Sequence, residues 1–129
     1  MLMYLARHKE SSVTIRDAAS ALNVQYTHLV KVVHQLGREG LLDTRRGSGG
    51  GVRLSRPPEG IRVGDVLRIT EGAKPLVNCS SPPCPLDGNC RLERALDRAQ
   101  AAFFAEMNQH TLADLAGSRG LDFVTLRSA

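Results

Sequence analysis

Apolar residues return at intervals of three and four along five stretches of the chain, which is the spacing of one face of an α-helix. Polar, glycine-rich or proline-rich segments separate these stretches, and one region alternates apolar and polar residues as β-strands do. The pattern predicts a mainly α-helical protein with a β-hairpin. The predicted helices lie at residues 2–6, 15–22, 25–39, 63–71 and 91–109.

The second and third helices predict a helix-turn-helix at about residues 16–39. Thr14 is suited to cap the second helix, with Asp17 three residues later in an acidic variant of the capping box. Asn23–Val24 is the turn, and Gly40 stands just after the third helix, where glycine commonly ends one. Two short helices joined by a tight turn are a motif that DNA-binding proteins place in the major groove.

Residues 41–56 predict the hairpin, which forms a wing attached to this motif. Two short alternating segments flank a glycine-rich tip at residues 47–51. Between Asp43 and Glu59 the chain carries four arginines and no acidic residue, which suits a wing that meets a polyanion.

A loop and a long helix are predicted to follow. Prolines and a glycine mark residues 76–90 as a loop, and the helix occupies about residues 91–109. Its apolar residues form one nearly straight seam, which we expect to pack against a second copy of the chain as a dimerisation helix. The seam consists of Leu92, Leu96, Ala99, Phe103 and Met107. A short capped turn is predicted at residues 111–116.

Charge points to a nucleic-acid partner. The 129 residues carry a formal net charge of +4, and residues 1–75 hold 12 of the 17 Lys and Arg residues but only 7 of the 13 acidic ones. No apolar run reaches the length of a membrane span, and the apolar opening lacks the basic leader of a signal peptide, so we expect a cytoplasmic protein. We expect residues 1–129 to form a single winged-helix regulator without enzymatic activity.

The candidate DNA contacts lie at the start of the third helix and in the wing. A helix in the major groove presents its first turns to base edges, and glutamine can bond adenine through two hydrogen bonds. Bare glycines let the wing backbone approach phosphates or the minor groove, with arginine beside them. The predicted contacts are Gln25, Tyr26, Thr27, His28 and Lys31 on the helix, and Arg45, Arg46, Gly49, Gly50 and Arg53 in the wing.

Cys79, Cys84 and Cys90 lie within twelve positions of the predicted loop. An odd number of cysteines without a secretion signal argues against a disulfide framework and favours metal or redox chemistry. Small zinc sites usually contain a C-x-x-C pair, which is missing here, whereas wider steps suit an iron–sulfur cluster held by thiolates. A zinc site and three unliganded thiols are alternatives. A thiol redox enzyme or electron carrier is a further one, disfavoured by the missing C-x-x-C and by the arginine-rich wing.

Taken together, these motifs resemble the NsrR/IscR group of winged-helix iron–sulfur regulators. The resemblance rests on the glycine tip after Arg45 and Arg46, on Ile61–Val66 and on the three-cysteine loop, and it covers nearly the whole chain. The segments around the first and third cysteines, and the later His110–Leu115, are similar to the nitric-oxide-sensing NsrR branch.

The resemblance implies a homodimeric repressor of nitric-oxide detoxification genes, which binds operator DNA while its cluster is intact and releases it on nitrosylation. It implies that the three cysteines hold one cluster per subunit, of the 2Fe–2S type, with 4Fe–4S also compatible. It assigns Gln25, Thr27 and His28 to base contacts, and Arg46 to the minor groove. A regulator of iron–sulfur assembly or of iron supply on the same scaffold is the alternative function.

Two features depart from the pattern of the group. Its members begin earlier, and an acidic residue of the partner subunit in that leading stretch is their fourth cluster ligand. We expect that this sequence starts part-way along its first helix and lacks that ligand. IscR-type members carry a histidine three residues after the third cysteine, where this chain has Glu93, which favours the NsrR branch. We expect Glu93 to lie on the exposed face of the long helix.

Overall fold

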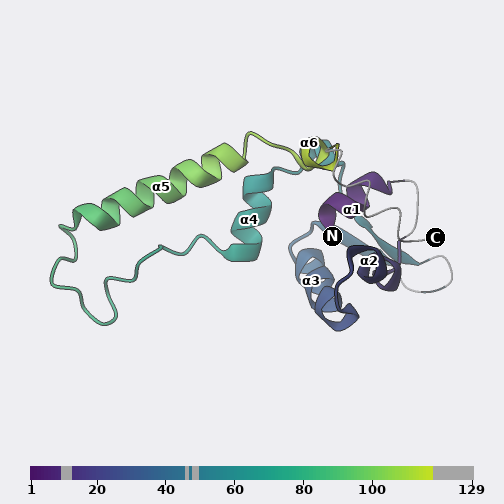
Figure 1. The fold of residues 1–129 in the computed structure, drawn as a ribbon, viewed down its shortest axis with the longest axis horizontal. Coiled ribbons are helices and arrows are strands. Elements are labelled where there is room, and N and C mark those ends of the chain that lie inside the picture. The colour runs from purple at the N-terminus through teal and green to yellow at the C-terminus, as the bar shows by residue number, and fades with distance from the viewer. Residues whose placement is uncertain (10–12, 46, 48–49, 118–129) are drawn as a thin grey trace. The chain divides into compact units, whose positions relative to one another are not determined.

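The computed structural model describes residues 1–9, 13–45, 47 and 50–117, which fold into two compact units (Figure 1). Of the described residues, those up to Ile61 and those from Thr111 to Gly117 belong to the first unit, and Arg62–His110 form the second. Helices account for most of the regular structure, and the first unit also carries a two-stranded antiparallel sheet. The predicted mainly α-helical fold with a hairpin is therefore confirmed.

The first unit begins with α1 (Leu2–Arg7), α2 (Ile15–Leu22) and α3 (Tyr26–Arg38). The start of α2 is fixed by Thr14, because its hydroxyl accepts a hydrogen bond from the backbone N–H of Asp17 at 3.1 Å. Asn23 follows α2 with a φ of 53°, a left-handed conformation that asparagine tolerates, and it turns the chain into α3. The predicted helix-turn-helix is thus present, and its capping residues act as expected.

Gly40 ends α3 and turns the chain into the hairpin. Its φ of 70° lies in the left-handed region that glycine adopts without strain. Its N–H donates to the carbonyl oxygen of Gly37 at 3.1 Å, and the N–H of Leu41 donates to that of Leu36 at 2.9 Å. These two bonds form a Schellman motif, which fixes the direction in which the chain leaves the helix.

The hairpin pairs β1 (Leu42–Arg45) with β2 (Gly51–Leu54). Thr44 lies opposite Val52 in the register, and the Val52 N–H also donates to the carbonyl oxygen of Val13 at 2.8 Å. This extra bond joins the segment before α2 to the sheet, so the wing is tied to the helix-turn-helix by backbone contacts.

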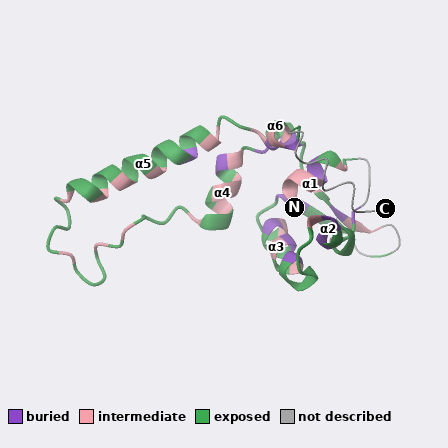
Figure 2. Cartoon of the chain, viewed as in Figure 1, coloured by how far each residue is buried: buried purple, intermediate pink, exposed green. Residues whose placement is uncertain are grey.

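The core of the first unit gathers buried side chains from its helices and hairpin (Figure 2). The unit is completed by η1 (Pro58–Gly60) and α6 (Leu112–Ala116), and α6 packs against both α1 and η1. On α2, Ala18, Ala19 and Ala21 are buried, whereas Ile15 and Leu22 are half-buried. Other core residues include Leu5, Leu29, Val33, Leu36, Leu41 and Ile61.

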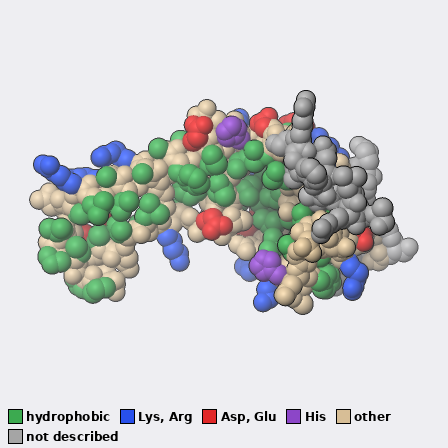
Figure 3. Space-filling model, in the orientation of Figure 1, with side chains coloured by type: hydrophobic (Ala, Val, Ile, Leu, Met, Phe, Trp, Pro, Cys, Tyr) green, Lys and Arg blue, Asp and Glu red, His purple; other side chains and the backbone are tan. Residues whose placement is uncertain are grey.

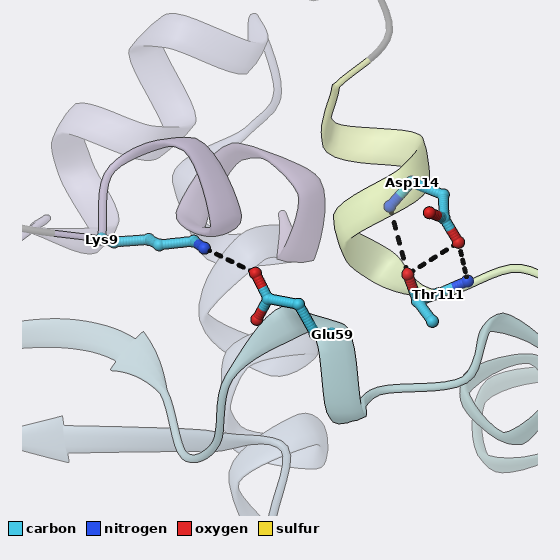
Figure 4. A network of polar contacts seen from close by, with 4 residues as sticks. All are labelled: Lys9, Glu59, Thr111 and Asp114. Carbon is cyan, nitrogen blue, oxygen red and sulfur yellow. Dashed lines mark hydrogen bonds and ion pairs between the residues drawn. The ribbon is translucent and has the colours of Figure 1, made fainter.

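Figure 4 shows two groups of polar contacts in the first unit, one between Thr111 and Asp114 and one between Lys9 and Glu59. At the start of α6, the Asp114 N–H donates to the Thr111 hydroxyl at 3.2 Å, and the Thr111 N–H donates to the Asp114 carboxylate at 2.7 Å. This capping box is the capped turn predicted from the sequence. On the surface, Lys9 donates to Glu59 at 2.9 Å, and this hydrogen bond lowers the pKa of the Glu59 carboxyl. An exposed pair of this kind adds little stability.

The second unit packs α4 (Val63–Glu71) against the carboxyl-terminal half of α5 (Arg91–Met107). Gly64 makes this contact close, because a methyl group on its Cα would lie 2.6 Å from the carbonyl oxygen of Phe104. Phe104 is buried, with the Arg68 guanidinium 4.6 Å from its ring centroid. α5 begins at the predicted residue and ends two residues earlier than predicted. Among the described helices, none is long and apolar enough to span a bilayer.

Replacing Gly64 with alanine tests this close packing. The added methyl group has no room between α4 and α5, so Gly64→Ala is expected to lower the free energy of unfolding by about 1–3 kcal/mol. Gly60→Ala is the matched control, because a Cβ there would meet no atom within 4 Å. Urea unfolding followed by circular dichroism measures both variants. Equal stability of Gly64→Ala and wild type would contradict the packing described.

Candidate functional site

The amino-terminal turns of α3 carry all the predicted helix contacts on the surface of the first unit. Gln25 is the N-cap, and Tyr26, Thr27, His28 and Lys31 follow on the helix. All five residues are exposed, while the opposite face of α3 is buried in the core. The core therefore anchors the helix and leaves polar side chains available for base edges and phosphates.

Tyr26 has a neighbour that sequence reasoning missed. The Arg16 guanidinium of α2 lies 5.1 Å from the centroid of the Tyr26 ring, within the range of a cation–π contact. Arg16 thus adds a cation beside the predicted DNA contacts. The sequence carries no signal for this contact, because it depends on how α2 and α3 cross.

The wing presents part of the predicted set of contacts. Arg45 ends β1, and its side chain is exposed. Gly50 is half-buried, and its N–H donates to the carbonyl oxygen of Gly47 at 2.8 Å. Two predicted contacts, Arg46 and Gly49, lie outside the described residues.

Arg53 has a partner within the hairpin. It lies directly opposite Asp43 in the register, and its Nη2 atom is 3.6 Å from an Asp43 carboxylate oxygen. Both side chains are about half exposed, so this is a surface ion pair of low strength, for which a phosphate can compete. Asp43 precedes the arginine-rich segment in the sequence, but the hairpin brings Arg53 of that segment opposite Asp43.

The three predicted cluster ligands are half-buried residues in an otherwise exposed loop of the second unit. Between residues 78 and 90, Cys79, Cys84 and Cys90 are half-buried and every other residue is exposed. All three are free thiols. The Cys84 N–H donates to the carbonyl oxygen of Cys79 at 2.8 Å and closes a turn between them. The loop therefore shields its cysteines and exposes its prolines and polar residues.

Cys90 joins this loop to α5. It is the N-cap of the helix, and its Sγ atom accepts a hydrogen bond from the Glu93 N–H at 3.5 Å. The first N–H groups of a helix carry partial positive charge, which favours an anion beside them. This end of α5 is therefore suited to hold a thiolate.

Two acidic residues lie beside Cys79. Its Sγ atom and one carboxylate oxygen each of Asp87 and Glu93 are all within 4.8 Å of one another. Partial burial raises the pKa of the Cys79 thiol, and the nearby Glu93 carboxylate and the other anionic groups of the loop raise it further. The expectation that Glu93 is exposed is wrong, because it is half-buried. Its position three residues after Cys90 puts both residues on one helix face, toward the cysteine loop.

The positions of the three cysteines do not match the geometry of three ligands on one zinc ion. Thiolates on one tetrahedral zinc lie about 4 Å apart, because each Zn–S bond is about 2.3 Å long. Within the described part of the chain, Cys79 with Asp87 and Glu93 is the one set of three such donors within 4.8 Å, and the three cysteines do not form a set of that size. An iron–sulfur cluster offers more than one iron to its thiolate ligands, and thiolates on different irons stand farther apart than thiolates on one ion. The described positions of the three cysteines therefore argue against one shared zinc ion and leave a cluster compatible.

Comparison with known proteins assigns the fold to a family. A model of the Rrf2 family, described as an iron-dependent transcriptional regulator, matches residues 1–118. Its members are transcriptional regulators rather than enzymes, which agrees with the expectation of no enzymatic activity and removes the thiol redox enzyme as an alternative.

Several solved structures are similar over most of their length. CymR of B. subtilis, described as its global cysteine regulator, is 29% identical with a TM-score of 0.72, over 89% of this chain and 86% of that one. CymR of Staphylococcus aureus is 26% identical with a TM-score of 0.70, over 91% and 89% of the two chains. IscR of T. potens is 24% identical with a TM-score of 0.67, over 88% and 76%, a likeness of fold. The family match and these structures agree with the helix-turn-helix and hairpin described above, and the chain belongs to the Rrf2 family of DNA-binding transcriptional regulators.

Proposed function

We propose that the protein is a nitric-oxide-sensitive repressor, which binds operator DNA while an iron–sulfur cluster occupies its cysteine loop and releases the DNA on nitrosylation. The observation that carries this proposal is the loop itself. Three free, half-buried cysteines lie in one loop that leads into a long helix, in a regulator of an iron-dependent family. In this proposal the protein acts in the cytoplasm, and residues 1–129 form a single regulator.

The DNA would be read by α3 and held by the wing. Gln25, Thr27 and His28 are exposed on the first turn of α3 and suited to base edges, with Tyr26 beside them. The remaining predicted contacts are suited to phosphates or to the minor groove. These are Lys31, Arg45, Arg46, Gly49, Gly50 and Arg53.

The proposed partner of α5 is a second copy of the chain. Leu92 is 64% exposed and Phe103 is 51% exposed, although both belong to the apolar seam predicted from the sequence. Figure 3 shows hydrophobic side chains at the surface of the second unit. Large apolar side chains left in water favour association, and a seam of this spacing suits helix–helix packing. A symmetric dimer also supplies the two reading helices that a two-part operator requires.

Cys79, Cys84 and Cys90 would hold one cluster per subunit, of the 2Fe–2S type, with 4Fe–4S as the alternative. When bound, such a cluster supplies iron to which nitric oxide binds. The chain contributes thiolate ligands, partial burial, and the partial positive charge at the start of α5 beside Cys90.

The chain can transmit the state of the loop through α5. Cys90 is both a proposed ligand and the N-cap of α5, and Leu92 of the proposed dimer seam follows two residues later. A fixed Cys90 therefore orders the first turn of the dimer helix. When the cluster is absent, only the Cys90 cap and the loop's own hydrogen bonds hold this turn, so the turn is less constrained. The two reading helices of the dimer must be about one DNA turn apart, ~34 Å, so a loosened dimer binds less tightly.

A regulator of iron–sulfur assembly or iron supply is the second candidate. The iron-dependent description of the family supports it, because dependence on iron need not involve nitric oxide. The two candidates differ in their response to nitric oxide at stoichiometric dose. Only the nitric-oxide-sensitive repressor must release DNA at that dose.

The central experiment measures DNA affinity against cluster state. DNA selected from a random library by the anaerobic, cluster-loaded protein serves as the probe, and fluorescence anisotropy at fixed salt reports binding. Nitric oxide from a donor compound, at one to a few equivalents per cluster, is expected to weaken binding at least about tenfold, the size of a typical allosteric coupling. Cys84→Ser is expected to bind as weakly as the apo protein. Equal affinity of apo and loaded protein would rule out the switch. Release on iron removal but not with nitric oxide would favour the second candidate.

Lys31 tests the proposed reading surface. Because each phosphate contact releases counterions, Lys31→Gln is expected to reduce the slope of log affinity against log salt by about 1, with similar loss on all DNA sequences. Lys9→Gln is the control, since it removes the same charge from a residue already paired with Glu59. Equal slopes for Lys31→Gln and wild type would exclude a phosphate contact by Lys31.

Phe103 tests the proposed dimer seam. A carboxylate in a packed apolar seam is strongly disfavoured, so Phe103→Glu is expected to convert the dimer to a monomer in analytical ultracentrifugation. Ala105→Glu introduces the same charge at an exposed position on the other side of α5 and is expected to remain dimeric. A dimeric Phe103→Glu protein would mean that the copies associate through another surface.

A further inference from the structure

We propose that the hollow between α2 and the start of α3 binds a phosphate of the DNA backbone, with Arg16 as its ligand and Tyr26 as the positioning residue for Arg16. The inference rests on the proposed reading surface of α3, but it does not depend on the cluster. It gives Tyr26 a role other than contact with base edges, and it adds α2 to the DNA-binding surface.

The lining of the hollow is the first support. Its polar residues are Arg16, Ser20 and Asn23 from α2 and its end, and Gln25 and Tyr26 from the start of α3. Arg16 and Ser20 are four residues apart, so they share one face of α2. Arg16 is the one charged residue among the described residues of this lining, and no acidic residue accompanies it. A polar hollow with a cation and no carboxylate suits an anion.

The free charge of Arg16 is the second support. Its side chain is exposed, and no carboxylate in the described part of the chain forms an ion pair with it. The neighbouring Asp17 is engaged elsewhere, because the Thr14 hydroxyl donates to its carboxylate at 2.6 Å. By contrast, Arg53 of the wing is paired with Asp43. Arg16 therefore has no ion pair to break before it donates to a phosphate.

Contact with the Tyr26 ring is the third support. The Arg16 Cζ atom lies 5.1 Å from the ring centroid, and Tyr26 is 44% exposed, so burial in the core does not explain the position of the ring. The N–H donors of a guanidinium lie in its plane, so a contact through its face leaves them available to phosphate oxygens. A side chain that is already held loses less freedom when it binds. The ring therefore prepares Arg16 for the phosphate.

Direct contact with a base is the rival role for Tyr26. A base contact would make the effect of changing Tyr26 depend on the DNA sequence and be independent of Arg16. A positioning role makes that effect similar on every DNA sequence, because phosphates carry no sequence information, and makes it depend on Arg16. A variant that lacks both side chains therefore distinguishes the two roles.

The experiment measures the affinity of the full chain, purified anaerobically, for selected DNA and for random DNA over a range of salt concentrations. It compares Arg16→Gln, Tyr26→Leu, the double variant and Tyr26→Phe, which keeps the ring. Arg68→Gln is the matched control, because Arg68 also lies over a ring, that of Phe104 at 4.6 Å, but belongs to the second unit. Far-ultraviolet circular dichroism checks that each variant is folded.

We expect Arg16→Gln to weaken binding about three- to tenfold on both DNA probes and to reduce the slope of log affinity against log salt by about 1. Tyr26→Leu is expected to weaken binding on both probes, and Tyr26→Phe to restore most of that loss. The double variant is expected to bind no more weakly than Arg16→Gln, because Tyr26 then has no guanidinium to position. Arg68→Gln is expected to bind as wild type does.

An unchanged salt slope in Arg16→Gln would overturn the phosphate contact. The positioning role would be overturned by additive losses in the double variant, by a Tyr26→Leu loss confined to the selected DNA, by no loss in Tyr26→Leu, or by an equal loss in Tyr26→Phe. Each of these results leaves the proposed reading surface of α3 intact. Wild-type protein that binds neither DNA probe would overturn that surface as well.

Discussion

The amino-terminal turn of α5 is the constraint on which the rest of the account depends. Cys90 caps the helix there, Glu93 donates its N–H to the cap, and its carboxylate lies near Cys79 on the far side of the loop. Thiols and carboxylates that can all carry negative charge are thus gathered at one helix end. Metal binding is coupled to local order wherever the ligands lie in a segment that the metal fixes. We therefore propose that occupancy of the loop and order in the first turn of α5 are coupled.

The first unit needs no such partner to hold its shape. Its helix-turn-helix is fixed by short-range devices, namely the Thr14 cap, the left-handed Asn23 and the Schellman motif at Gly40. Its wing is joined to the helices through the bond between Val52 and Val13. A DNA-binding unit of fixed shape and the proposed ligand-binding loop are the two parts that a sensing regulator requires, because one supplies recognition and the other supplies response.

Local signals made most of the fold predictable from sequence. A capping threonine, a terminal glycine and a glycine-rich tip each act over a few residues. The helices and strands next to these signals were therefore predicted with end points that differ by only a few residues from the structure. Three site contacts were not predictable. Asp43 meets Arg53 through hairpin register, Arg16 meets Tyr26 through a helix crossing, and Glu93 meets Cys79 through the path of a loop. Each depends on tertiary geometry that sequence spacing does not encode.

The central claim is that the cysteine loop binds an iron–sulfur cluster. Iron and acid-labile sulfide content, with the visible absorption spectrum, of protein purified without oxygen tests it most directly. The account predicts a coloured protein with about two iron and two sulfide per chain, or about four of each for the larger cluster. Colourless protein without iron, or protein with one zinc per chain, would contradict it and leave a DNA-binding regulator with an unexplained loop.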